Sequence, residues 1–145
     1  MKSYGEYNDL NLKLIIVLER CYQTITKKDR HSMQEDTNLT VPQFSVLEIL
    51  YHKGDLKVGD IIEKTLSSIG NINVVVNNLE RQGLVKKEKC SLDKRVTYVK
   101  ITSDGRKIMD RVFPKHVDNI SKITEMLSED EKKILIELLK KWGKS

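Results

Sequence analysis

Apolar residues recur every three or four positions along most of the chain, and a period of two occurs in one short region only. From Leu10 to Ile25 the apolar positions line one face, which predicts an amphipathic helix that must bury this stripe. The polar run KKDRHSMQEDTN at residues 27–38 is predicted to be a connection.

Three more helices are predicted between residues 40 and 82. Thr40 can cap the first, with Pro42 in its first turn and Gln43 closing a capping box. A short helix spans about 58–65, and a longer one about 68–82 ends at Gly83. The positions predicted to face inward are Phe44, Leu47, Leu50, Tyr51, Val58, Ile61, Ile62, Ile72, Val75, Val76 and Leu79.

Residues 84–101 are predicted to form a β-hairpin. The segment 96–101 alternates as a half-solvated strand does, and residues 90–94 supply the turn. Helical spacing then resumes from Thr102 to about Leu127. A last helix begins with a capping box at 128–131 and is predicted to bury Ile134, Leu135, Leu138, Leu139 and Trp142.

The predicted hairpin is strongly basic, with two acidic residues, Glu88 and Asp93, among its 18 positions. Its cationic side chains are Lys86, Lys87, Lys89, Lys94, Arg95 and Lys100. The whole chain carries a formal charge of +5. Because Lys and Arg neutralise phosphates, this hairpin beside an amide-rich helix favours double-stranded DNA as the partner.

The helix before the hairpin presents short polar groups on the face opposite its apolar stripe. The candidate DNA-binding residues there are Ser67, Ser68, Gly70, Asn71, Asn73, Val74 and Asn77. Asn can bond adenine with both amide atoms in the major groove, so the asparagines are predicted to read bases and Ser68 to contact phosphate. A merely solvated helix face is the alternative for any one of them.

The hairpin turn adds Asp93, Lys94 and Arg95 to the candidate DNA contacts. An Asp two residues before an Arg can hold the guanidinium in one orientation, which predicts that Arg95 enters the minor groove, where negative potential is enhanced. Lys87 is a further candidate. The alternative for Lys86, Lys87 and Lys89 is that they only keep an edge strand soluble.

Two short helices, the second exposed and rich in amides, followed at once by a hairpin make a winged helix-turn-helix. The predicted fold class is therefore mainly α with a small β-hairpin. A single domain is expected over 1–145, with a DNA-binding lobe at about 40–102 and dimerisation helices at about 8–30 and 103–143. The apolar stripes of the end helices exceed what one chain of this length buries easily, which favours a two-fold homodimer.

The sequence contains few signals for metal binding, disulfides, catalysis or membrane insertion. Cys21 and Cys90 fit no metal or disulfide pattern; Cys21 lies on the apolar stripe of the first helix, where a small buried side chain is the commoner role. The chain has no Walker loop, nucleophile elbow or zinc-protease motif, so no enzyme, cofactor or metal is expected. With no apolar run long enough for a bilayer and no leader pattern, a cytoplasmic protein without membrane partners is expected.

The segments GNINVVVNNLERQGLVKK and DKRVTYVKITSDGRKI resemble the MarR (multiple-antibiotic-resistance regulator) family of bacterial winged-helix transcription regulators. The resemblance extends over essentially the whole chain. Three motifs together make it fairly specific: the Asp93-Lys94-Arg95 turn of the hairpin, the NLE-x-x-GLV junction at residues 78–85, and the helix start at residues 102–105. It implies a single MarR-type domain and an obligate homodimer that usually represses from a pseudo-palindromic operator. Lys57 departs from the pattern, since relatives often cap the third helix there with Ser or Thr.

The resemblance also implies release of the operator by a small phenolic, anionic or electrophilic effector. In the family such ligands lodge near the first, second and fifth helices, which makes Tyr22, Phe44, Tyr51 and Met109 candidates, although ordinary core is the alternative for each. A cysteine in the first helix serves some members as a redox sensor, which extends this hypothesis to Cys21. Two alternatives without DNA recognition remain: a winged-helix module for protein assembly, and a ligand-binding protein.

Overall fold

The computed structural model describes residues 2–65 and 72–143, with backbone alone for 30–36. The chain forms two units. One, here called the winged-helix unit, comprises residues 30–116; the other, the terminal unit, comprises residues 1–29 and 117–145. Helices α1 (Glu6–Asp36) and α5 (Ser103–Thr124) each have residues in both units.

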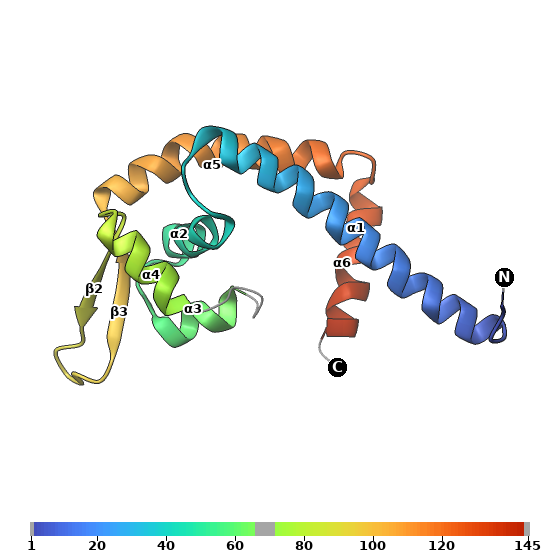
Figure 1. The fold of residues 1–145 in the computed structure, drawn as a ribbon, viewed down its shortest axis with the longest axis horizontal. Coiled ribbons are helices and arrows are strands. Elements are labelled where there is room, and N and C mark those ends of the chain that lie inside the picture. Colours follow the sequence, from blue (N-terminus) through green and yellow to red (C-terminus); the bar gives the residue numbers. More distant parts are fainter. Residues whose placement is uncertain (1, 66–71, 144–145) are drawn as a thin grey trace. The chain divides into compact units, whose positions relative to one another are not determined.

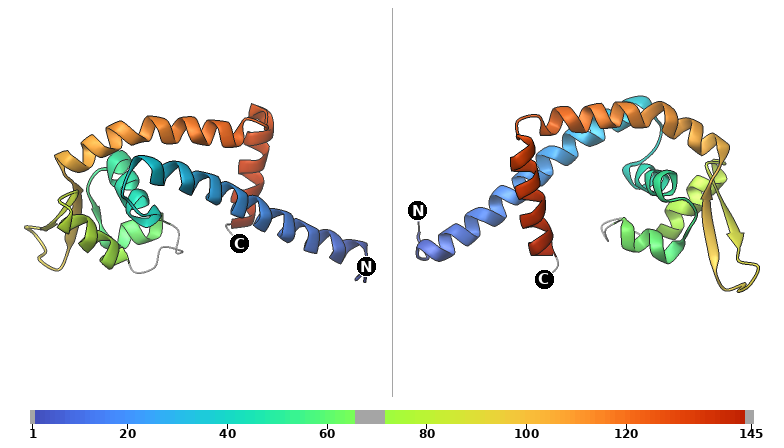
Figure 2. Two further views of the ribbon diagram at one scale, coloured as in Figure 1. Left: turned by 45° about the horizontal axis from the view of Figure 1, so that its top comes forward. Right: turned by 180° about the vertical axis from the view of Figure 1, so that it is seen from behind.

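The winged-helix unit contains α2 (Val41–Lys53), β1 (Leu56–Lys57), α3 (Val58–Lys64), α4 (Ile72–Arg81), β2 (Val85–Lys89) and β3 (Thr97–Ile101). Its sheet is antiparallel in the order β1-β3-β2. The hairpin of β2 and β3 projects away from the helices α2 to α4 (Figures 1 and 2). This arrangement confirms the predicted winged helix-turn-helix, with β1 added as a third strand.

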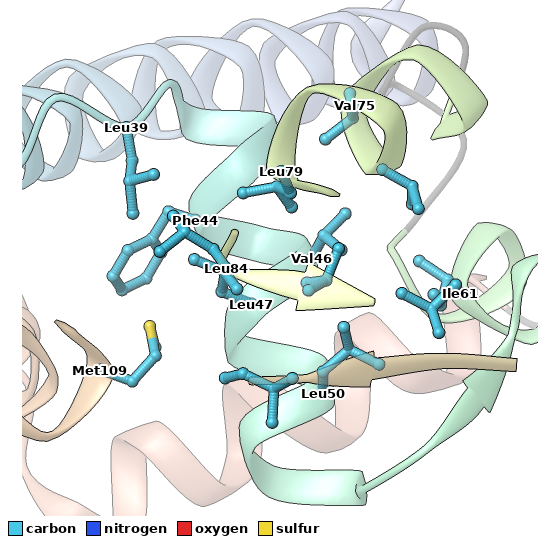
Figure 3. Close-up of a cluster of buried hydrophobic side chains, with 14 of the residues drawn as sticks. Leu39, Phe44, Val46, Leu47, Leu50, Ile61, Val75, Leu79, Leu84 and Met109 are labelled. Carbon is cyan, nitrogen blue, oxygen red and sulfur yellow. The ribbon is translucent and has the colours of Figure 1, made fainter. Parts of the chain in front are cut away.

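The core of the winged-helix unit is built on α2. Phe44, Leu47 and Leu50 on one side of α2 are 3%, 0% and 0% exposed, as the spacing predicted. Figure 3 shows these side chains pointing toward those of Leu79 from α4 and Met109 from α5. Val99 of β3 is also fully buried and attaches the hairpin to the core. The β2–β3 hairpin, here called the wing, is therefore anchored at its base by apolar packing.

Helix starts and ends follow the predicted local chemistry. The Thr40 side chain accepts a hydrogen bond from the Gln43 backbone N–H, and Gln43 Oε1 accepts one from Thr40 N at 2.9 Å. Helix α3 begins after Lys57 without a side-chain cap, as the departure at that position led us to expect. Gly83 has φ of 72°, the left-handed conformation that ends a helix such as α4 and suits glycine.

Three predictions about local structure are wrong. Residues 27–36 continue α1, because this polar run contains no Gly or Pro and consists mostly of residues that tolerate a helix. Strand β1 was missed, because two residues are too short to show a period. Ile62 was expected to face inward but is 45% exposed, whereas its neighbour Ile61 is fully buried.

The terminal unit consists of α1 up to residue 29, the end of α5 and α6 (Glu129–Gly143). The capping box at the start of α6 is confirmed, since Ser128 N donates to Glu131 Oε2 and Glu131 N donates to Ser128 Oγ. The apolar faces that the sequence predicted to be buried, and whose stripes it assigned to a dimer, are exposed in the single chain. Leu10, Leu14 and Val17 are 64%, 53% and 55% exposed, and the five apolar residues predicted to be buried on α6 are 40–61% exposed.

Candidate nucleic-acid interface

Helix α4 divides cleanly into a buried and an exposed face. Ile72, Val75, Val76 and Leu79 face the core, as predicted. The opposite face presents Asn73, Val74 and Asn77, all exposed. The other predicted contacts before this helix, Ser67, Ser68, Gly70 and Asn71, lie outside the residues that the structure describes.

The turn after α4 sets where the wing begins. Gly83 N donates to Glu80 O and Leu84 N donates to Leu79 O, each at 2.9 Å, so the chain reverses at the left-handed Gly83. Thr102 then closes the base of the hairpin, since its N–H donates to Leu84 O at 3.0 Å and its hydroxyl to Gly83 O at 2.7 Å. These hydrogen bonds attach both ends of the hairpin to the end of α4.

Lys87 connects the wing to α4 through its side chain. Its ammonium lies 2.6 Å from Asn77 Oδ1 and 3.1 Å from Glu80 Oε2, and its backbone N–H donates to Glu80 Oε1 at 3.1 Å. Because the Lys87 ammonium bonds the Glu80 carboxylate, the pKa of Glu80 lies below its ordinary value. The sequence placed Lys87 and Asn77 at the interface but did not indicate that they bond each other. It also missed Glu80, whose one signal is its three-residue spacing from Asn77 on one helix face.

The wing turn holds Arg95 as predicted from Asp93. Arg95 N and Nε donate to Asp93 Oδ1 at 3.0 and 3.2 Å, and Nη2 donates to Oδ2 at 3.4 Å. The Arg95 guanidinium lowers the pKa of the Asp93 carboxyl, so the pair stays charged at neutral pH. The Arg95 side chain is nevertheless 91% exposed. Its guanidinium is thus fixed on one side and open to a ligand on the other.

The remaining wing cations fall into two groups. Lys86, Lys89 and Lys94 are exposed. Lys100 is held between Asp55 Oδ2 at 3.2 Å and Glu88 Oε2 at 3.0 Å, which raises its pKa. The positive charge available to a polyanion is therefore concentrated at the exposed strand positions and the turn.

Comparisons with known proteins agree with this geometry. The model of the MarR family matches residues 39–97. The chain is 38% identical to the HTH-type transcriptional regulator MhqR of Bacillus subtilis, over 92% of this chain and 91% of that protein. The chain belongs to the MarR family. It is a winged-helix transcription regulator, and neither alternative without DNA recognition is favoured.

Solved structures share the fold. Sco3205 of Streptomyces coelicolor, a MarR family regulator solved in complex with DNA, matches with a TM-score of 0.83 and 19% identity, over 99% of this chain and 89% of that one. BpsR of Bordetella bronchiseptica, whose DNA binding is regulated by 6-hydroxynicotinic acid, matches with a TM-score of 0.75 and 23% identity, over 90% and 98%.

The candidate effector residues of this MarR chain differ in accessibility. Phe44 and Met109 are 3% and 0% exposed, which favours a role in the hydrophobic core over contact with an effector. Tyr51 is half-buried and donates to Asp110 Oδ1 at 2.6 Å; this hydrogen bond raises its pKa. Tyr22 is 63% exposed. Cys21 is exposed, so the expectation that it is a buried apolar group is not met in the single chain, where most of the apolar stripe of α1 is exposed.

Cys90 at the wing turn is partly exposed. Its thiol pKa is lowered by the backbone N–H groups of Asp93 and Leu92, with a smaller contribution from Lys57.

Among the side chains that the structure describes, in residues 2–29, 37–65 and 72–143, no three of His, Cys, Asp or Glu are grouped to hold a metal ion. No helix of the described residues has both the length and the apolar character to cross a membrane. The relatives are transcriptional regulators rather than enzymes.

Proposed function

We propose that this chain is a homodimeric repressor that recognises a pseudo-palindromic operator through α4 and the wing. Asn73, Val74 and Asn77 would lie in the major groove, together with the predicted contacts at 67–71, while Arg95 enters the adjacent minor groove. The observation that carries the proposal is the Asp93–Arg95 pair, which presents an oriented but 91% exposed guanidinium at the wing turn. Such a regulator acts where the bacterial chromosome lies, in the cytoplasm.

Selection of bound sequences from a random pool of DNA duplexes tests this proposal. The purified chain should enrich a two-fold symmetric site, because each half-site meets one recognition helix. Arg95→Glu should then weaken binding to that site at least about tenfold, since a base contact of this kind contributes about 1–3 kcal/mol. Arg111→Glu makes the same charge change at an exposed position of α5 and serves as the control. Equal losses for the two variants would leave Arg95 with no special role.

The homodimer is supported by the apolar surface of the terminal unit. Leu18, Leu139 and Trp142 line an open groove there, and more apolar side chains of α1 and α6 are exposed around it. Burial of such faces is the main favourable term in association. Light scattering on the purified chain should give twice the mass of one chain at micromolar concentration. A monomer that still selects a symmetric site would contradict the obligate dimer.

Release of the operator by a small or thiol-reactive molecule completes the proposal. Cys21 lies on the apolar stripe of α1 and is exposed in the single chain, so its access to an electrophile is measured on the homodimer. Mild peroxide or quinone treatment should modify Cys21, as detected by mass spectrometry, and release DNA from the wild type but not from Cys21→Ser. Release that persists in Cys21→Ser and is lost in Cys90→Ser would transfer the role to the wing. The regulation of BpsR by 6-hydroxynicotinic acid makes small aromatic acids the first ligands to test without oxidant.

A further inference from the structure

Asn77, Glu80 and Lys87 form one connected group between α4 and β2. Glu80 binds Lys87 twice, through the backbone N–H at 3.1 Å and the ammonium at 3.1 Å. The ammonium in turn donates to Asn77 Oδ1 at 2.6 Å. Asn77 and Glu80 are three positions apart and share one face of the helix, so a single lysine reaches both.

This contact determines which atoms of Asn77 remain for DNA. An asparagine that pairs bidentately with adenine uses its oxygen to accept from N6 and its NH2 group to donate to N7. Here the oxygen already accepts from Lys87. No residue in the described part of the chain accepts a hydrogen bond from Asn77 Nδ2. Asn77 Oδ1 keeps a second lone pair, but the Lys87 ammonium beside it repels the positive end of the adenine N6–H donor, so Asn77 as held favours donation from its NH2 group over bidentate pairing.

The side chain of Lys87 is correspondingly less available to DNA than those of the wing lysines Lys86, Lys89 and Lys94, which form no ion pair within the described part of the chain. It is 32% exposed and lies between two oxygen acceptors of α4. A lysine that neutralises a phosphate releases a counterion, and each such contact adds about 0.9 to the slope of log affinity against log salt. A lysine that stays on Glu80 and Asn77 adds nothing of that size.

We propose that Glu80 and Lys87 are positioning residues that hold Asn77 as a hydrogen-bond donor, so that Asn77 selects a base-pair acceptor in the major groove instead of pairing bidentately with adenine. The inference rests on the proposed function, in which α4 reads DNA. Purine N7, guanine O6 and thymine O4 all accept in the major groove, so the base pair at Asn77 tolerates more than one identity.

The test measures base preference rather than affinity alone. The site selected by the wild type is changed one base pair at a time, and the position whose preference disappears in Asn77→Ala is the one that Asn77 reads. Lys87→Met frees Asn77 Oδ1 and should raise the preference for adenine at that position about tenfold, the discrimination that a good bidentate contact gives. This gain should be absent from the double variant Lys87→Met with Asn77→Ala. The salt slope of Lys87→Met should remain that of the wild type.

Matched variants separate positioning from charge and from folding. Lys86→Met removes a neighbouring exposed lysine of the same strand and should keep the wild-type base profile. Glu80→Ala should change the profile, whereas Glu88→Ala, which removes an equal charge paired to Lys100 instead, should not. Lys87→Arg keeps a cation between Glu80 and Asn77 and should restore the wild-type profile. Thermal unfolding of each variant verifies that it is folded.

Two results would overturn the proposal: an unchanged base profile in Lys87→Met, or a salt slope reduced by about 0.9, which marks Lys87 as a phosphate contact. A wild-type chain that selects no sequence at all would refute the proposed function and this inference with it. A wild-type chain that selects a site, with a Lys87→Met profile unchanged, refutes this inference alone.

Discussion

Every buried apolar side chain of the described residues lies in the winged-helix unit, from Leu39 to Val112, whereas no described residue of the terminal unit is buried. The apolar content of the two units is not the reason, since α1 and α6 carry long apolar stripes. The winged-helix unit covers its apolar faces with its own sheet and helices. The terminal unit has helices alone and leaves theirs exposed. A helical period therefore predicts that a face will be buried, but not which molecule buries it.

The largest expected effect is on stability, and its dependence on protein concentration should differ between the two units. Leu47→Ala removes a fully buried side chain and should lower the free energy of unfolding by about 2–5 kcal/mol at any protein concentration. Leu139→Ala on α6, which is 40% exposed in the single chain, should destabilise only by weakening a dimer. Its midpoint of thermal unfolding should shift relative to the wild type as the protein is diluted. Equal, concentration-independent losses would mean that the terminal unit packs within one chain.

Gly105 tests how closely the winged-helix unit is packed. A Cβ at Gly105 would overlap Leu84 O and lie 2.8 Å from Ile101 Cγ1, so α5 meets the base of the wing without room for a methyl group. Gly105→Ala should lower the free energy of unfolding by about 1–3 kcal/mol, as overpacking does. Gly59→Ala is the control, because nothing lies within 4 Å of its added Cβ. Denaturant titration measures both, and a tolerated Gly105→Ala would indicate that the wing base shifts easily.

The sequence predicted the winged-helix unit better than the terminal unit for a physical reason. Caps, glycine turns and apolar periods are local, and the winged-helix unit satisfies them within one chain, as at Thr40 and Gly83. The errors arose where a local signal was weak or its partner lay elsewhere. Residues 27–36 lack an apolar stripe yet remain helical, and the stripe containing Cys21 is largely exposed in the single chain.

The interface shows the same limit at the scale of single side chains. The Asp93–Arg95 contact joins residues two apart, and the turn alone predicts it. The contact between Asn77 and Lys87 spans ten residues and depends on how β2 returns along α4. No local pattern encodes that approach. The sequence therefore predicted the contact within the wing turn, but not the contact between α4 and β2.

Each unit has a helix that begins with a capping box, so removing the cap should have a smaller effect that can be compared between the units. Thr40→Ala in the winged-helix unit and Ser128→Ala in the terminal unit each remove a side-chain acceptor at a helix start, a loss of about 1 kcal/mol. We expect the Thr40 variant to lower the global free energy of unfolding by that amount. The Ser128 variant should mainly speed amide hydrogen exchange in the first turn of α6, because few contacts transmit its loss. Equal global effects would show that α6 unfolds together with the winged-helix core.

The smallest expected effect concerns two partly exposed aspartates, one in each unit. Arg95 lowers the pKa of Asp93 chiefly through its side chain, whereas the Ser3 hydroxyl and then the Tyr4 N–H lower that of Asp9. A lowered folded-state pKa means that each carboxylate contributes stability above its ordinary value of 3.8 and loses it as the pH falls through the lowered value. Salt screens a charged partner more than a neutral one. Carbon NMR titration of the carboxyl groups should therefore show the pKa of Asp93 rising toward 3.8 in high salt, while that of Asp9 changes less. Equal salt responses would mean that Arg95 lowers the pKa of Asp93 mainly through its hydrogen bonds, which salt screens little. The Asp93–Arg95 contact would then persist at the ionic strengths where DNA binding is measured.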